Sequence, residues 1–421
     1  MDLLLTHGYF LEEDPKELQI MKPYAPLGIL YLSSHLRAKG FGVEVYDSTF
    51  GSRAELFRIL ETEKAATLGV YVNLMTRANA LAIIERAAAC GWRVIAGGPE
   101  PANYPEEYLA AGAQTVVAGE GEPAMEAILR GEPFDPGRQI ADLDAQPWPD
   151  RERVDIGRYL STWREHHGAG SVSVITARGC PYHCRWCSHS TFGKTHRRRS
   201  AAGVADEVEW ILDRYHPDML WLADDVFTIH HGWLDQYTGE MKRRGLRIPF
   251  ECITRADRMN SRVAAQLAEL GCFRVWIGSE SGSQRILDAM ERGVSVQQVR
   301  DAVAHLKQNG IQTGMFFMWG YEGEDLPDIE ATYEHVKACA PDTFLTTISY
   351  PIKGTPYYEE VAPKLVHLGE WRATTDRDIY VRGRHSRRFY QHADQLLRSR
   401  TAAEAEQARA GLRAAYHEVE A

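Results

Sequence analysis

Short apolar segments alternate with longer amphipathic segments along the first 130 residues, and this alternation restricts the fold more than any other feature of the chain. Strands are predicted at Leu3–Leu5, Val43–Tyr46, Thr67–Val72, Arg93–Ala96 and Thr115–Val117, and helices at Leu27–Lys39, Arg53–Lys64, Arg77–Cys90, Tyr104–Ala111 and Pro123–Leu129. Such alternation predicts a doubly wound parallel sheet with helices on both faces. In open sheets of this kind a ligand binds beyond the carboxyl ends of the strands.

The predicted strand ends of this first domain, residues 1–132, carry glycines and polar side chains. They fall in Tyr71–Asn73, Gly97–Glu100 and Gly119–Glu122. Glycine at such a position lets the backbone approach a large flat ligand closely. These turns therefore mark the expected ligand edge of the sheet.

A second alternation follows a proline-rich linker predicted over residues 133–170. Its six strands are predicted at Val172–Thr176, Met219–Ala223, Pro249–Ile253, Phe273–Ile277, Gln312–Phe317 and Phe344–Ser349. Six strands separated by helices predict a partial (β/α)6 barrel over residues 171–362, with its chemistry at the carboxyl ends of the strands. Residues 363–421 are predicted to form a short, charged, helical tail.

Three of the seven cysteines form one motif: Cys180, Cys184 and Cys187 have C-x3-C-x2-C spacing just after the first strand of the second alternation. A structural zinc takes four protein ligands, and an iron–sulfur cluster held by protein alone takes four cysteines. Three thiolates therefore indicate a cluster with one open iron position. The alternative is a zinc site closed by His183 or His189. The other four cysteines stand singly in apolar segments, where cysteine is typically a small buried side chain.

The run from Cys180 to Cys187, with Trp186 before the last cysteine, resembles the signature loop of the radical S-adenosylmethionine (SAM) enzymes. The resemblance implies a 4Fe-4S cluster on the three cysteines, with SAM bound at the open iron and cleaved reductively to a 5'-deoxyadenosyl radical. It also implies that Trp186 lies beside the adenine of SAM and that the backbone of Gly320 meets the adenine edge.

Charged and hydroxyl side chains follow the predicted barrel strands, at Asp224-Asp225, Arg255 and Ser279-Glu280. Such groups are costly to bury unless they are solvated or matched to a ligand. SAM offers three matches: its ammonium group for Asp224, its carboxylate for Arg255, and its ribose hydroxyls for Ser279 and Glu280. The alternatives are that Asp224-Asp225 caps the next helix and that Arg255 pairs with Asp257 on the surface.

The turns of the first domain resemble the cobalamin-binding domain that precedes many radical SAM barrels, with Pro26-Leu27-Gly28 opening the first helix. By this resemblance the candidate corrin contacts are Asn73, Thr76, Gly97, Gly98, Glu100, Glu120, Gly121 and Glu122. Two departures stand out: Asp47–Gly51 replaces the loop that supplies histidine to cobalt, and Glu100 stands where relatives often have histidine. We therefore expect that no histidine holds the lower face of cobalt. The alternative is a domain that serves as scaffold alone.

Composition narrows the class of partner. The net charge of −10 argues against a nucleic-acid partner, no run approaches the roughly 20 apolar residues of a membrane span, and Asp2 interrupts any signal peptide. Grouped cysteines without an export signal indicate a reducing cytoplasm.

One basic run, Lys194–Arg199, is interpreted as a solvated loop before a helix, or alternatively as a clamp for an anionic group.

As a whole the chain resembles the branch of anaerobic magnesium-protoporphyrin monomethyl ester cyclases and class B radical SAM methyltransferases. The resemblance implies a cobalamin-dependent enzyme that methylates an unactivated carbon of a small molecule and takes electrons from a flavodoxin or ferredoxin. A radical cyclase, rearranging or oxidising enzyme without methyl transfer is the first alternative, and a non-enzymatic iron–sulfur or zinc protein is the second. The motifs identify neither the substrate nor a catalytic acid or base.

Overall fold

The computed structural model describes residues 1–418, which form two compact units. The first unit comprises residues 1–181, 189–221 and 371–375, and the second comprises residues 182–188, 222–370 and 376–418. The first unit therefore contains, besides the predicted first domain and linker, residues 171–181 and 189–221 of the predicted barrel and residues 371–375 of the predicted tail. None of the helices in the described part of the chain has the length and apolar character that crossing a membrane requires.

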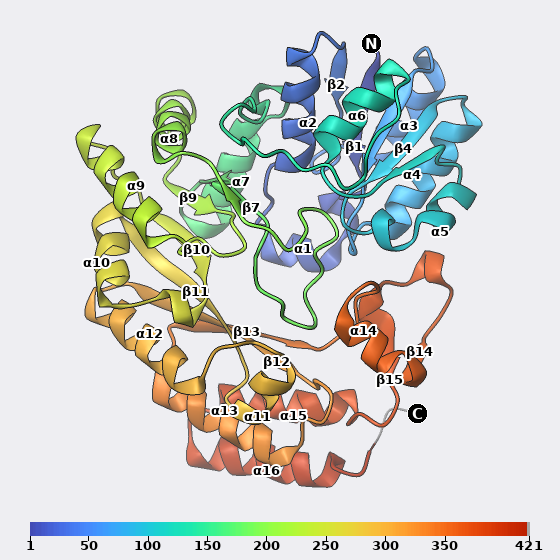
Figure 1. Cartoon of the computed structure of the whole chain (residues 1–421). Coiled ribbons are helices and arrows are strands. Elements are labelled where there is room, and N and C mark those ends of the chain that lie inside the picture. The colour runs from blue at the N-terminus through green and yellow to red at the C-terminus, as the bar shows by residue number, and fades with distance from the viewer. Residues whose placement is uncertain (419–421) are drawn as a thin grey trace. The chain divides into compact units, whose positions relative to one another are not determined.

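The first unit contains a parallel five-stranded sheet in the order β2-β1-β3-β4-β5 (Figure 1). Its strands are β1 (Leu3–His7), β2 (Val43–Val45), β3 (Thr67–Tyr71), β4 (Arg93–Gly97) and β5 (Thr115–Val117). This order is one of the two common doubly wound arrangements. Each predicted strand is present, with ends that differ by at most two residues.

The two faces of this sheet bury different helices because successive side chains of a strand point in opposite directions. Leu3 and Leu5 pack with α2 (Leu27–Ala38) and α6 (Gly121–Arg130) on one face. Leu4 packs on the other face. That face is covered by α3 (Arg53–Thr62), α4 (Arg77–Ala89) and α5 (Pro105–Ala110).

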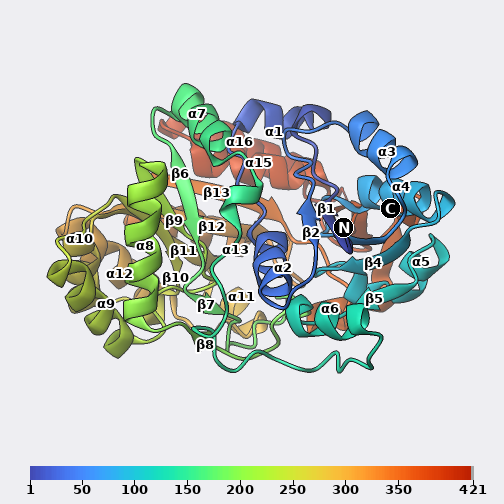
Figure 2. The same cartoon turned by 90° about the horizontal axis from the view of Figure 1, so that it is seen from above.

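The second sheet has six parallel strands in the order β13-β12-β11-β10-β9-β6. They are β6 (Ser171–Val174), β9 (Met219–Leu222), β10 (Phe250–Thr254), β11 (Cys272–Glu280), β12 (Gln312–Trp319) and β13 (Thr343–Ile348). The helices α9 (His231–Arg243), α10 (Ser261–Leu270) and α12 (Val296–Gln308) line the outer side of β10 to β12 (Figure 2). The sheet matches the predicted six-stranded α/β arrangement.

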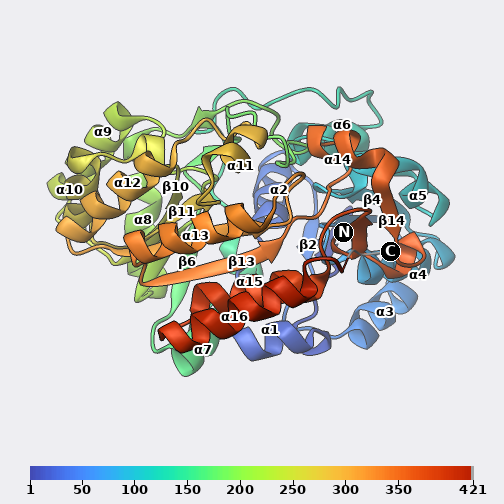
Figure 3. The same cartoon turned by 90° about the horizontal axis from the view of Figure 1, so that it is seen from below.

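Two segments differ from the sequence-based description. The predicted linker contains helix α7 (Ile156–His167), which Asp155 caps, and α8 (Ala201–Tyr215) follows the basic run. The tail contains, besides α15 (Arg387–Arg398) and α16 (Ala402–Ala415), an antiparallel pair of strands, β14 (Leu365–His367) and β15 (Ile379–Val381). Figure 3 shows α15 and α16 lying side by side.

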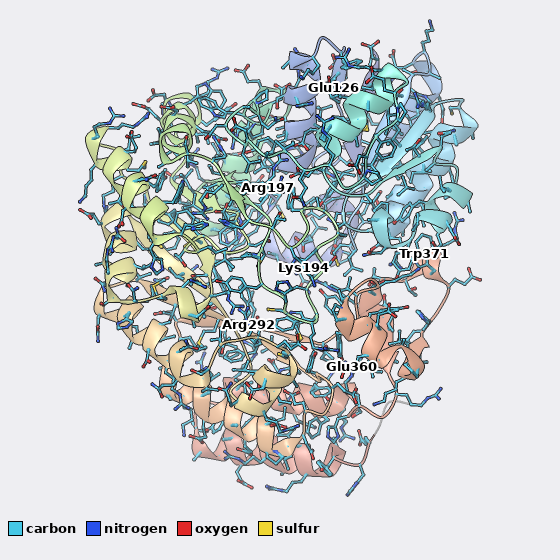
Figure 4. All side chains as sticks on the ribbon, in the orientation of Figure 1. Glu126, Lys194, Arg197, Arg292, Glu360 and Trp371 are labelled. Atoms are coloured by element: carbon cyan, nitrogen blue, oxygen red, sulfur yellow. The ribbon has the colours of Figure 1, made fainter. Side chains whose placement is uncertain are left out.

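The prediction that the basic run is a solvated loop is wrong for two of its arginines. Arg199 is buried and pairs with Glu207 of α8, whose carboxylate also binds Arg151 at 2.6 Å. Arg197, labelled in Figure 4, pairs with Glu120 at 2.9 Å. These cations neutralise carboxylates of their own chain.

Candidate functional site

A cavity of about 110 Å³ lies at the carboxyl-terminal side of the first sheet. All of its lining residues belong to the first unit. They come from the ends of β1 and β3 to β5, from α2 and α6, and from residues 175–192 around the cysteine loop, and they include Gly28, Tyr71, Gly97, Gly98, Gly119, Glu120, Gly121, Glu122, Met125, Ile175, Arg178, Thr191 and Phe192. None of the described residues that line the cavity is a histidine.

Glycines shape one wall of this cavity. Gly98 has a φ of +107°, and a side chain there would place its Cβ 2.4 Å from the carbonyl oxygen of Val72. The aromatic ring of Tyr71 lies between Gly28 and Gly98, 3.9 Å and 3.0 Å from the Cβ positions that these glycines leave empty. The glycines therefore give a flat ligand access to backbone and to this ring.

Two buried carboxylates form another wall. Glu120 is 2% exposed and accepts hydrogen bonds from Arg178 at 3.3 Å, Arg197 at 2.9 Å and the Ile140 amide at 2.5 Å. Glu122 accepts from Arg178 at 2.6 Å. Because arginines neutralise both carboxylates, the wall presents polar groups without an unpaired charge.

The structure places three predicted corrin contacts elsewhere. Asn73 and Thr76 form a turn at the start of α4, in which the Asn73 amide donates to Thr76 Oγ1 at 3.0 Å. The Glu100 carboxylate accepts from Arg77 Nε at 2.6 Å, with both side chains buried. Arg77 also lies 4.8 Å from the ring centroids of Tyr104 and Trp371. Asn73, Thr76 and Glu100 therefore support the fold, whereas Gly97, Gly98, Glu120, Gly121 and Glu122 line the cavity.

The cysteine loop is divided between the units: Cys180 belongs to the first, and Cys184 and Cys187 belong to the second. Cys184 is 5% exposed, and the Cys187 amide donates to the Cys184 carbonyl at 3.2 Å. A hydrogen bond from the Cys187 thiol, with help from Arg292 and Arg255, lowers the pKa of Cys184 below its usual value. That hydrogen bond, reinforced by burial, raises the pKa of Cys187. Of these two thiols, Cys184 is therefore the one that more readily becomes a thiolate.

Within residues 1–418, no three His, Cys, Asp or Glu side chains are grouped as ligands of a single metal ion. A four-iron cluster differs from such a site because each cysteine binds a different iron.

Two buried arginines lie beside Cys184. Arg255 donates from Nε to Asp257 at 3.0 Å and lies 3.6 Å from the ring centroid of Tyr182. The pair between Arg255 and Asp257 that the alternative predicted is therefore present. It does not lie on the surface, however, because Arg255 is only 3% exposed. Arg292 donates to the Gly278 carbonyl at 2.9 Å, and its Nε has no partner in the described structure.

Glu280, the last residue of β11, has a strained backbone. Glu280 has a φ of +64°, where β-strand register shifts between Gly278 and Glu280. Its carboxylate lies 3.8 Å from Arg292, and burial raises the pKa of Glu280 to about 6. A residue in left-handed backbone beside a thiol and a guanidinium is typical of a functional site. Neighbouring Ser279 instead faces the core, where its hydroxyl contacts His335 Nε2 at 3.1 Å.

The remaining predicted SAM contacts have mixed outcomes. Trp186 packs against Tyr321 with 6.5 Å between ring centroids, and Arg292 lies 5.9 Å from its ring. Asp224 is buried. Burial of Asp225, with a smaller contribution from the charge of Asp224, raises the pKa of Asp225. The two aspartates do not cap the next helix, because α9 begins after His230. The Gly320 amide donates to Glu324 at 2.5 Å and its carbonyl accepts from Arg384 at 3.2 Å, so the chain itself uses the backbone groups assigned to adenine.

Sequence reasoning missed Arg178 and Arg292. Arg178 stands two residues before Cys180, and its proximity to the motif was a usable signal. Arg292 follows the C-terminus of a short helix, α11 (Gln284–Ala289). Cations are common near the C-termini of helices in general. Nothing in the local pattern separates it from a surface arginine.

Family models match two successive parts of the chain. Residues 20–129 match the B12 binding domain and residues 174–336 match the radical SAM superfamily. The chain is 28% identical over 392 residues to an uncharacterized methyltransferase of Pyrococcus horikoshii, covering 86% of this chain and 83% of the relative. It is 22% identical to the anaerobic magnesium-protoporphyrin IX monomethyl ester cyclase of Rubrivivax gelatinosus, covering 82% of this chain and 68% of the relative.

Solved structures share the fold. One is the radical SAM methyltransferase TsrM of Kitasatospora setae, solved with cobalamin and a [4Fe-4S] cluster bound. The superposition has a TM-score of 0.71 at 19% identity and covers 86% of this chain and 74% of the TsrM chain. The cobalamin-dependent radical SAM enzyme OxsB, with aqua-cobalamin bound, has a TM-score of 0.74 at 16% identity and covers 94% of this chain and 66% of its own. With a B12-binding domain and a radical SAM domain in one chain, this protein belongs to the cobalamin-dependent radical SAM enzymes.

Proposed function

We propose that the chain is a methyltransferase that methylates an unactivated carbon of a small molecule. The observation that carries this proposal is the combination, in one chain, of a glycine-lined cavity in the B12-binding domain and the three-cysteine loop of the radical SAM domain. When bound, a 4Fe-4S cluster supplies the electron that cleaves SAM, and cobalamin supplies the methyl group.

We assign the cluster to Cys180, Cys184 and Cys187, and the corrin to the cavity. The cavity fits a corrin because glycines and apolar side chains form its wall. Glu120, Glu122 and Arg178 offer hydrogen-bonding groups for the amide side chains of the corrin ring. Its lining has no histidine among the described residues, which supports our expectation that no histidine holds the lower face of cobalt.

For SAM we retain Trp186, Asp224, Arg255 and Glu280 and add Arg292. The buried Nε–H of Arg292 lacks a partner in the described structure, so it is a donor suited to the SAM carboxylate. Ser279 and Gly320 are weaker candidates for SAM contacts. His335 already bonds the Ser279 hydroxyl, and Glu324 and Arg384 already bond the Gly320 backbone.

The test is anaerobic reconstitution of the full chain with iron and sulfide, followed by optical and electron paramagnetic resonance (EPR) spectra with hydroxocobalamin and SAM. We expect a cluster signal that SAM perturbs, retained corrin, and both 5'-deoxyadenosine and S-adenosylhomocysteine during turnover. Cys184→Ala serves as the control and should lack the cluster. Wild type without a cluster would contradict the assignment.

Cyclisation or rearrangement without methyl transfer is the second candidate, favoured by the likeness to the Rubrivivax gelatinosus cyclase over most of this chain. The same experiment separates the two candidates. Deoxyadenosine formed without S-adenosylhomocysteine would favour the second one.

We also propose that the enzyme works in the reducing cytoplasm, where a flavodoxin or ferredoxin donates the electron, and that it has no nucleic-acid partner. The grouped cysteines and the net charge of −10 support this setting. Reduction of the reconstituted cluster by purified flavodoxin, followed by EPR, tests the electron donor.

A further inference from the structure

Two guanidinium groups converge on one cysteine of the cluster loop. Nη1 of Arg292 lies 3.5 Å from Cys184 Sγ, and Nη1 of Arg255 lies 3.7 Å from the same atom. Arg292 is 8% exposed, Arg255 is 3% exposed and Cys184 is 5% exposed. The two N–H···S contacts are therefore shielded from water.

Other contacts hold both guanidinium groups in place. Arg292 donates from Nη2 to the Gly278 carbonyl at 2.9 Å, and Arg255 donates from Nη2 to the Arg292 carbonyl at 2.8 Å. Asp257 and the ring of Tyr182 fix the remaining sides of Arg255. The donors are thus oriented toward Cys184 before any ligand binds. Figure 4 labels Arg292.

Gly278 gives Arg292 the room to reach the sulfur. A Cβ at this position would lie 2.5 Å from Arg292 Nη2, and also 2.7 Å from Glu280 Oε1. Gly278 therefore sets the position of the Arg292 guanidinium without contributing charge.

The electrostatic consequence follows from the charge of the cluster. Reduction adds an electron to a group whose sulfur atoms already carry negative charge. Hydrogen bonds to cluster sulfurs and nearby cations stabilise the reduced form more than the oxidised form, and they set the potential of such clusters. Burial strengthens this effect because the local dielectric is low.

We propose that Arg292, together with Arg255, is a positioning residue that raises the reduction potential of the cluster through N–H···S bonds to Cys184. In the step concerned, one electron leaves a donor of the flavodoxin or ferredoxin class and enters the cluster, and the arginines transfer neither proton nor electron. The inference rests on the proposed cluster at Cys180, Cys184 and Cys187.

The experiment is a potentiometric titration of the reconstituted full-length protein, without SAM, followed by the EPR signal of the reduced cluster. Arg292→Met should lower the equilibrium constant for reduction about tenfold, which is 59 mV for a one-electron couple. Gly278→Ala should shift the potential in the same direction with no change in charge. Arg292→Lys keeps the charge and should fall between wild type and Arg292→Met.

Arg258→Met is the matched control. Arg258 belongs to the same loop as Arg255, is half-exposed, and bonds Tyr182 Oη at 2.5 Å. We expect its potential to equal that of wild type. Iron and sulfide content and circular dichroism establish that each variant is folded and loaded.

Unshifted potentials in Arg292→Met and Gly278→Ala would overturn the inference, and so would equal shifts in Arg292→Met and Arg258→Met, which indicate a general charge effect. If Arg292→Met fails to hold the cluster, the potential of Gly278→Ala decides. A wild type without a cluster would overturn the proposed function and this inference together, whereas a loaded wild type with unshifted variants overturns this inference alone.

Discussion

At the scale of single residues, buried charges in this protein come with specific partners. Arg151 and Glu207 are both fully buried in the first unit, 2.6 Å apart, and Arg151 also donates to the Ser173 carbonyl of β6 at 2.9 Å. The Arg199 guanidinium pairs with the same Glu207 carboxylate. Such groups are stable only because each charge is matched.

Removing Arg151 should therefore destabilise the first unit strongly. We expect Arg151→Ala to lower the free energy of unfolding by about 3–5 kcal/mol, because the Glu207 carboxylate stays buried with one cation fewer. Urea denaturation measures the change. Arg214→Ala, which breaks an exposed pair with Glu152, is the control and should change it by about 1 kcal/mol or less. Equal effects from the two variants would contradict the role of burial.

Glu324 predicts a pH dependence in the second unit. Burial raises the pKa of its carboxyl from 4.5 to about 8. A folded-state pKa above the unfolded value means that stability is highest below the unfolded pKa and declines as pH rises through the folded one. Unfolding free energy should therefore fall between about pH 4.5 and about pH 8. Glu324→Gln, which can still accept from the Gly320 amide, should flatten this slope. An unchanged slope in urea titrations would rule out Glu324 as its source.

At the scale of elements, the sequence predicted the strands and major helices well and the site residues less well. Every strand of the two parallel sheets was predicted because apolar runs between turns are local signals. Arg292 and the Arg151–Glu207 pair were missed because their partners are distant in sequence. Glu100 and Ser279 stand at predicted strand ends, yet their side chains turn into the core, which spacing along the chain does not encode.

The cavity at the ends of β3, β4 and β5 gives a prediction at the same scale. A Cβ at Gly97 would meet only Val117, at 3.8 Å and beyond, so the position has room for a side chain and Gly97→Val should fill cavity space. We expect hydroxocobalamin to bind about tenfold more weakly or worse, a loss of about 1.4 kcal/mol. Equilibrium dialysis measures the affinity. Gly239→Ala in α9, where a Cβ has no neighbour within 4 Å, is the control. Wild-type affinity in Gly97→Val would place the corrin elsewhere.

At the scale of the whole molecule, the chain folds into two units, and the cavity that we assign to the corrin is lined by the first alone. Chains with more than one such unit commonly unfold in more than one transition. A ligand that binds one unit should stabilise that unit and leave the other transition in place. The two proposed cofactor sites can therefore be separated by the transition that each cofactor shifts.

We expect calorimetry of the apoprotein to resolve two transitions, of which hydroxocobalamin raises one. At a free concentration of about 100 times the Kd, the bound unit should gain about 2.7 kcal/mol, because the ligand binds the folded form and not the unfolded form. Gly97→Val should lose this shift while keeping both transitions. Arg292→Met should keep the shift, because Arg292 belongs to the second unit. A single transition that moves as a whole would instead show that the units unfold cooperatively, and the corrin would then stabilise the second unit as well.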